Sequence, residues 1–200
     1  QSADMKYLHK LKKKYKFKII EDASHAVGAS YNRTKVGSCV HSDITVFSFH
    51  PVKIITTAEG GMALTNNKNI HDKIHRLRTH GITNDKLLMK KRPKEEIWNY
   101  QQLDLGYNYR MNDIQAALGL SQIKRLDEYI KCRQEIAKYY NFELKNLPLT
   151  TPWQLPNFYS SYHLYPVLIE NNLINKNQRQ VYNELLENDI AVNLHYIPVH

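Results

Sequence analysis

Four side chains in the first third of the sequence are of types that could act together on one ligand. Asp22 follows Phe17–Ile20, an apolar run that is typical of a buried strand. An acid at the carboxyl end of such a strand lies where open α/β sheets bind ligands, although a helix N-cap is an equally simple interpretation. His25 follows three residues later and could stack on a ring, hydrogen-bond to it, or only cap a helix.

The other two side chains, Ser48 and Lys53, belong to a later strand-like segment and the turn after it. Thr45–Phe49 is β-branched and aromatic, which favours a strand. Ser48 lies near its end, where a hydroxyl beside backbone amides can bind a phosphate. Lys53 has apolar neighbours, and burial lowers the pKa of a lysine, so its amine could attack a carbonyl to form a Schiff base. Alternatively, Ser48 only faces a neighbouring strand, and Lys53 extends into solvent from a half-buried turn.

Considered together, these residues fit one cofactor, pyridoxal 5′-phosphate (PLP). PLP needs an amine for its aldehyde, an anion for its pyridinium nitrogen and donors for its phosphate. Lys53, Asp22 and Ser48 could supply these groups in that order, with His25 beside the ring.

The surrounding sequence predicts alternating helices and strands that would position these side chains. Apolar spacing predicts helices over residues 3–14 and 69–79, and a long helix from 112 to about 146 with a bend near Gly119 or Arg125. A turn at Gly60-Gly61 precedes a strand at 62–65. In the last third we expect a loop over 148–161, strands over 162–169 and 190–194, and a helix over 176–187. This alternation favours an α/β sheet, and the last third reads as a βαβ-like unit.

The composition is that of an ordinary globular protein with an excess of positive charge. The 200 residues carry a formal net charge of +9, and 42% of them are hydrophobic. Basic clusters within 6–18 and 86–94 could bind a nucleic acid, but no nucleic-acid motif accompanies them, so we interpret them as a solvated helix face and a basic loop. The sequence contains no run of 18 apolar residues, so it predicts no membrane-spanning helix. Cys39 and Cys132 lie far apart, which fits a reducing cytoplasm better than a disulfide scaffold.

One pair of residues has the spacing of metal ligands. His71 and His75 are four residues apart on a predicted helix, which can place two imidazoles on one face. Because no third ligand is evident, we expect no metal there.

Six motifs, in a fixed order, make the sequence resemble one protein family. They are Glu21–Ala26, Phe47–Lys53, Glu59–Gly61, Gly106–Met111, Gln115–Gly119, and His195-Tyr196 followed by Pro198. Together they resemble the sugar-nucleotide aminotransferases of the DegT/DnrJ/StrS type over essentially all 200 residues. The resemblance implies an α/β fold of the PLP-dependent transferase type I, with a mixed, mostly parallel sheet between helices. It also implies that residues 1–120 are part of a large PLP-binding domain, and that 121–200 are a linking helix and part of a small C-terminal α+β domain.

The same resemblance implies a role for each candidate residue. Lys53 would bind the cofactor aldehyde and later move a proton between cofactor and substrate, and Asp22 would pair with the pyridine nitrogen. His25 would sit by the ring and Ser48 would bind the phosphate. Asn108 would reach the phosphate of the partner subunit's cofactor, so that a homodimer with shared active sites would be required.

The implied reaction is a transamination of a nucleotide sugar in the cytoplasm. Because of Ile55–Gly61 and Ser160–Pro166, the resemblance is strongest to the family members of pseudaminic acid synthesis. These transfer an amino group from L-glutamate to C4 of a UDP-linked 4-keto-6-deoxy N-acetylhexosamine. Amination at C3 or of another nucleotide sugar stays open, whereas Lys53 argues against the family's dehydratases, in which a histidine replaces the lysine. A basic nucleic-acid-binding regulatory protein is the alternative from another class, and it would leave the coincidence of Asp22, Ser48 and Lys53 unexplained.

The ends of the sequence suggest a longer protein. The first residue is Gln1, and the last residues, Ile197–His200, lie inside a motif. We therefore expect an internal segment, which lacks the family's N-terminal phosphate ligands and would be poorly stable and inactive by itself.

Overall fold

The computed structural model describes residues 2–90 and 96–197. Its helices are α1 (Met5–Tyr15), α2 (Lys68–Leu77), α3 (Asp113–Ile123), α4 (Leu126–Glu143), the 3-10 helix η1 (Asn171–Leu173) and α5 (Gln178–Glu187). Its strands are β1 (Ile20–Asp22), β2 (Ser30–Tyr31), β3 (Thr34–Lys35), β4 (Ile44–Ser48), β5 (Gly61–Leu64), β6 (Ile82–Thr83), β7 (Gln101–Gln102), β8 (Leu149–Thr150), β9 (Phe158–Tyr159) and β10 (Leu168–Ile169).

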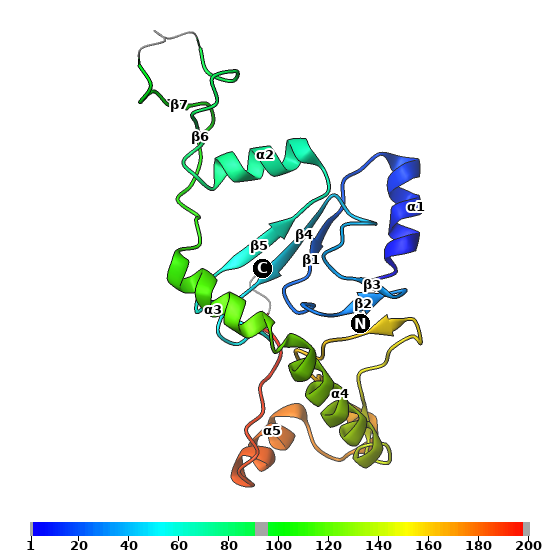
Figure 1. Ribbon diagram of the computed structural model, residues 1–200. Helices are drawn as coiled ribbons and strands as arrows, with labels where there is room; N and C mark the ends of the chain where they lie inside the picture. Colours follow the sequence, from blue (N-terminus) through cyan, green and yellow to red (C-terminus); the bar gives the residue numbers. More distant parts are fainter. Residues whose placement is uncertain (1, 91–95, 198–200) are drawn as a thin grey trace.

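A mixed sheet of order β1-β4-β5 forms the centre of the molecule (Figure 1). β4 runs parallel to β1 and antiparallel to β5. In this register Asp22 pairs with Val46, so β1 and β4 end at the same edge of the sheet, Asp22 on one strand and Ser48 on the other. The carboxyl ends of parallel strands are where α/β sheets bind ligands, and this edge therefore positions the first two candidate residues.

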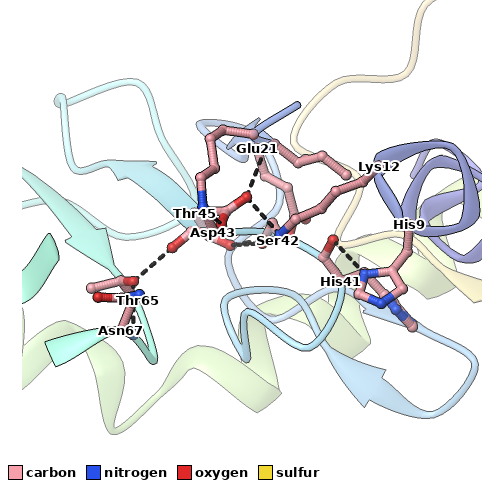
Figure 2. A network of polar contacts seen from close by, with 11 residues as sticks. His9, Lys12, Glu21, His41, Ser42, Asp43, Thr45, Thr65 and Asn67 are labelled. Atoms are coloured by element: carbon pink, nitrogen blue, oxygen red, sulfur yellow. Dashed lines mark hydrogen bonds and ion pairs between the residues drawn. The ribbon is translucent and has the colours of Figure 1, made fainter. Parts of the chain in front are cut away.

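A polar network fastens the opposite end of the sheet (Figure 2). The Asp43 carboxylate lies 2.6 Å from the Lys12 ammonium of α1 and accepts a hydrogen bond of 2.9 Å from the Ile19 amide. The Thr65 hydroxyl donates to the Asp43 carbonyl at 2.6 Å. Asp43 thus joins α1, β1 and the end of β5 at the point where β4 begins.

The main apolar cluster lies beside the edge of the sheet where β1 and β4 end. Its buried members come from β4 and from the segments that follow β1 and β4, and are Ala23, Val27, Phe47, Phe49 and Ile55. Met111, Leu126 and Tyr129 pack against them from the start of α3 and from α4. Burial of these side chains fixes the backbone on both sides of the candidate residues.

The helices confirm the sequence-based expectations. The pattern over 3–14 forms α1, the pattern over 69–79 forms α2, and 176–187 contains α5. The long helix is interrupted at Lys124 and Arg125, which separate α3 from α4, close to the expected bend. α4 then leads away from the sheet toward α5 (Figure 1).

Several strand predictions were wrong. The first strand is Ile20–Asp22 rather than Phe17–Ile20, because pairing with β4 begins at Ile20; Phe17 is instead 40% exposed. In the segment 162–169 only Leu168 and Ile169 form a strand, because the carbonyls of Tyr162 and His163 accept hydrogen bonds from the Arg133 side chain.

The last third of the chain is also not a βαβ-like unit. Residues 190–194 have no strand partner, β8 and β10 pair antiparallel, and the expected loop 148–161 contains β8 and β9. Among the described residues, no helix combines the length and apolar character needed to cross a membrane.

Candidate active site

Asp22 ends β1 with its carboxylate held by Ser24. The Ser24 amide donates to Asp22 Oδ1 at 3.1 Å, and the Ser24 hydroxyl donates to the same oxygen at 2.5 Å. These two hydrogen bonds, helped by the nearby His25 and Lys53, lower the pKa of Asp22 below its usual value despite partial burial. Asp22 is therefore ionised at neutral pH, and both bonds go to Oδ1, so Oδ2 can meet a cationic partner.

Lys53 lies in a turn that is anchored by buried residues directly after it. Its amide donates to the His50 carbonyl at 2.9 Å, and the next two residues, Ile54 and Ile55, are buried. The Lys53 side chain is half-buried, and its positive charge contributes to lowering the pKa of Asp22 and of His25. The amine and the carboxylate are therefore within electrostatic reach of one another at the same edge of the sheet.

The loop after Lys53 is held in place by α3. Thr57 is 3% exposed and lies against Gly119 of α3, where an added Cβ would come within 2.8 Å of Thr57 Cγ2. A glycine at 119 therefore allows the helix to approach the loop closely.

Ser48 lies at the end of β4, beside the turn that carries Lys53. Its hydroxyl oxygen accepts a long hydrogen bond of 3.4 Å from the His50 amide. The proton of that hydroxyl is thus available for an anion, as phosphate binding would require.

Asn108 occupies a different part of the molecule. It is exposed, forms an isolated bridge with Thr79, and follows Tyr107, whose amide donates to the Leu77 carbonyl. Within the described residues no contact joins Asn108 to the other four candidates. The structure thus brings Asp22, His25, Ser48 and Lys53 to one edge and leaves Asn108 on an exposed stretch.

Three further residues lie close to His25, and the sequence did not indicate that they belong to this site. The His163 ring lies 4.3 Å from the His25 ring, centroid to centroid, and the His195 ring lies 6.3 Å from it. Ser161, 1% exposed, donates its hydroxyl to the His25 carbonyl at 3.2 Å. The motifs around 160 and 195 were part of the family resemblance, but local spacing could not show that they meet residue 25.

A cavity of about 570 Å³ opens at this place. Among the residues that line it are Asp22, His25, Ser160, Ser161, His163 and His195. Lys53 does not line this cavity. Its charge nevertheless contributes to the lowered pKa values of three residues that do line it, Asp22, His25 and His163. The volume is in the range of small-molecule sites.

The chemistry of these residues fits PLP. Asp22 could offer a protonated ring nitrogen an ionised carboxylate whose Oδ2 has no hydrogen bond within the described residues. Lys53 could offer an amine whose charge acts on that carboxylate, and Ser48 a hydroxyl proton at the end of the neighbouring strand. The His25 ring provides a flat surface at the cavity wall.

The competing readings receive less support from the geometry. The rings of His71 and His75 are 6.1 Å apart, and His71 Nδ1 lies 3.0 Å from Asp72. No group of three or more His, Cys, Asp or Glu side chains in the described ranges is arranged to hold a metal. On the helix of the supposed nucleic-acid surface, Arg76 pairs with Asp104 at 2.7 Å. Lys91, Arg92 and Lys94 of the basic loop lie outside the described residues.

Comparison with known proteins then decides the family. The family model for the DegT/DnrJ/EryC1/StrS aminotransferases matches residues 1–200. The chain belongs to this aminotransferase family. Its mixed α/β architecture is the type I fold of PLP-dependent transferases, as the sequence predicted.

Individual relatives give a more detailed comparison. The chain is 39% identical, over 200 residues, to the UDP-4-amino-4,6-dideoxy-N-acetyl-beta-L-altrosamine transaminase of Campylobacter jejuni serotype O:2, covering 100% of this chain and 50% of that protein. Helicobacter pylori PseC, an aminotransferase involved in pseudoaminic acid biosynthesis, superposes with a TM-score of 0.83 at 34% identity, over 99% of this chain and 50% of PseC.

A third neighbour has been solved with the cofactor. The putative sugar aminotransferase Spr1654 of Streptococcus pneumoniae in its PLP-form superposes with a TM-score of 0.81 at 27% identity, over 98% of this chain and 52% of that chain. The present chain thus spans about half the length of the relatives it matches.

Proposed function

We propose that the protein is a PLP-dependent transaminase in which Lys53 is the catalytic amine. The observation that supports the proposal is that the charge of Lys53 contributes to the lowered pKa of Asp22, which lies at the edge where β1 and β4 end. PLP, when bound, supplies an electron sink that makes the substrate's C–H bond acidic.

The remaining work falls to residues of this chain. The Lys53 amine would hold the cofactor aldehyde covalently and, once displaced by an incoming amine, would carry the proton from one carbon to the next at Nζ. Asp22 Oδ2 would hold the proton on the ring nitrogen, which keeps the ring electron-poor. Ser48 would donate its hydroxyl proton to the phosphate, and His25 would lie beside the ring.

The proposal includes a homodimer in which Asn108 reaches the partner subunit's cofactor phosphate. In support of it, the stretch around Asn108 and the following helix expose large apolar side chains: Leu105 is 86% exposed, Tyr109 73% and Ile114 83%. Apolar patches of this kind mark contact surfaces, and a second copy would cover them.

The proposed substrates are L-glutamate as amino donor and a UDP-linked 4-keto-6-deoxy N-acetylhexosamine as acceptor, aminated at C4. The names of the Campylobacter relative and of PseC support this choice, and amination at C3 is the alternative. A nucleotide-sugar substrate also suits the cytoplasm. The interruption at Lys124-Arg125 supports a division into a large-domain part, 1–120, and a linking helix with part of a small domain, 121–200.

An absorbance spectrum tests the reaction class. The protein, in the longest form that its gene encodes, is mixed with PLP and then with L-glutamate. We expect a visible band of the lysine-bound cofactor that moves to the near-ultraviolet when glutamate is added. A spectrum identical to that of free PLP would contradict the proposal. Incubation with UDP-4-keto sugars, followed by NMR of the product, distinguishes C4 from C3.

Replacement of the amine tests the role of Lys53. Lys53→Arg keeps the charge but cannot bond to the aldehyde, so the visible band should disappear and turnover should fall by about a thousandfold or more. Lys68→Arg, on the exposed face of α2, is the matched control and should change neither. Full turnover in Lys53→Arg would remove Lys53 from the catalytic role.

A further inference from the structure

A short segment, Ser160–His163, connects α4 to His25, and we call it the strap. On its α4 side, the Gln134 side chain donates to the Ser160 carbonyl at 2.5 Å, and Arg133 Nη1 donates to the carbonyls of Tyr162 and His163 at 3.0 and 3.3 Å. Three side-chain hydrogen bonds thus fix the backbone of the strap, in place of pairing with another strand.

On its other side the strap contacts His25 twice. The buried Ser161 hydroxyl donates to the His25 carbonyl at 3.2 Å. The His163 ring packs on the His25 ring with 4.3 Å between centroids and 56° between planes. One contact therefore holds the backbone of His25 and the other its side chain.

The His163 ring is uncharged at neutral pH. Burial lowers its pKa to about 4, and the positive charges of His25, Lys53, Arg133 and His195 act in the same direction. Its Nδ1 is buried and has no hydrogen-bond partner among the described residues. The contact with His25 is thus packing between two tilted, uncharged rings and involves no hydrogen bond from Nδ1 within the described residues.

His25 itself needs such support. It is exposed at the cavity, and neither of its ring nitrogens has a hydrogen bond within the described residues that would set the ring's orientation. A ring held only by its own side-chain torsions would populate several rotamers, and ordering it would then cost free energy when a ligand binds.

We propose that Ser161 and His163 are positioning residues that fix His25 before the ligand enters, so that its ring is already in place for a planar cofactor. This inference rests on the proposed function for the identity of that cofactor, but the ordering of His25 is a property of the apoprotein. Within the part of the chain that the structure describes, the other ring near His25 is that of His195, with 6.3 Å between centroids.

The first measurement therefore uses the protein without cofactor. Histidine side-chain resonances are recorded by ¹⁵N NMR, with His25 assigned by its loss in His25→Gln. His163→Leu keeps the volume but removes the flat ring, so it should broaden or shift the His25 resonance. His163→Phe restores a flat ring without nitrogens, and the His25 signals should return to their wild-type behaviour. His75→Leu, on the surface of α2, is the matched control.

The second measurement is the affinity for PLP by fluorescence titration. We expect a loss of about tenfold for His163→Leu and for Ser161→Ala, and less than threefold for His163→Phe, since one lost positioning contact corresponds to roughly a factor of ten. If His163→Leu does not fold, His163→Phe decides: a loss of tenfold or more in the folded Phe variant overturns the inference. Wild-type His25 signals and PLP affinity in His163→Leu would also overturn it. If the wild type binds no PLP, the proposed function fails, while the NMR comparison still tests the positioning of His25.

Discussion

Two neighbouring acids of β1 serve different parts of the molecule because successive side chains of a strand point to opposite faces. Glu21 accepts a hydrogen bond of 3.1 Å from the Thr45 hydroxyl, which is fully buried in the sheet. Asp22 points to the other face, where Ser24 holds its carboxylate, although both acids are among the residues that line the cavity. A shift of one residue in the pairing with β4 would exchange them, so the register Asp22–Val46 is a condition for the site.

Asp22→Asn separates the charge of this residue from its shape. Asparagine can still accept the hydrogen bond from Ser24, so PLP binding should survive, but the ring nitrogen loses its anionic partner. We expect kcat/KM to fall by about a hundredfold or more. Steady-state kinetics with glutamate check this, with Asp72→Asn on α2 as control. An unchanged rate in Asp22→Asn would show that this carboxylate does not face the cofactor.

At the scale of elements, sequence periodicity located the helices and most of the central sheet. It failed where contacts between distant segments determine whether a stretch forms a strand. The spacing of apolar residues is enough for α1, α2 and α5, because each carries its half-buried apolar side chains on one face. Tyr162–Ile169 has strand-like composition, yet Arg133 and Gln134 of α4 take the hydrogen bonds that a neighbouring strand would have made. The candidate residues Asp22, Ser48 and Lys53 could be found because each lies at the end of a local strand signal or shortly after it. The meeting of His25 with Ser161 and His163 could not be found, because it depends on how distant segments pack.

The hairpin of β6 and β7 and the stretch before Asn108 depend on one glycine. Gly81 has φ +70°, and a Cβ there would lie 1.8 Å from the Asp104 carbonyl oxygen. Gly81→Ala should therefore destabilise the protein by about 2–4 kcal/mol, from backbone strain and this clash together. His80→Gly is the matched control: His80 also has a positive φ, 56°, so glycine there should be neutral or slightly stabilising. Urea denaturation compares the two; equal stabilities would contradict the prediction.

The network at the start of β4 predicts a specific acid sensitivity. Burial alone would raise the pKa of Asp43, but hydrogen bonds from Lys12, the Ile19 amide and Lys18 outweigh it and lower the pKa to about 2. Because the pKa is lower in the folded state than its usual 3.8, the stabilisation is complete above pH 3.8 and is lost as the pH falls toward 2.

Asp43→Asn should cost about 1–3 kcal/mol at pH 7, the usual range for hydrogen bonds to a charged group, and should remove this part of the acid sensitivity. Asp72→Asn, which breaks an exposed i,i+4 pair with Lys68, should cost less than about 0.5 kcal/mol. Denaturant melts at pH 7 and pH 2.5 test both. A wild-type stability for Asp43→Asn at pH 7 would show that the network does not fasten the sheet.

At the scale of the whole molecule, the exposed apolar surface around α3 indicates how copies would associate. Ile114 lies in the first turn of α3, where a glutamate is favourable for the helix dipole. Ile114→Glu should therefore leave the subunit folded, while a buried, unpaired charge should weaken a dimer strongly. For the proposed homodimer, light scattering should show half the wild-type mass, and PLP affinity should fall because Asn108 would no longer reach the other subunit. Leu173→Glu, at a position that is also largely exposed but lies on η1, should remain dimeric. A dimeric Ile114→Glu would place the contact surface elsewhere.

The hydrogen bond from Ser161 to His25 spans 136 positions of sequence, and β2 and β9 pair over a similar separation. Closing so large a loop delays the contact relative to helices and neighbouring strands. A nascent chain that has emerged past Lys53 would already contain Asp22, Ser48 and Lys53. Ser161 and His163, which contact His25, would not yet have been synthesised. Binding of PLP would accordingly follow the translation of this region rather than accompany it.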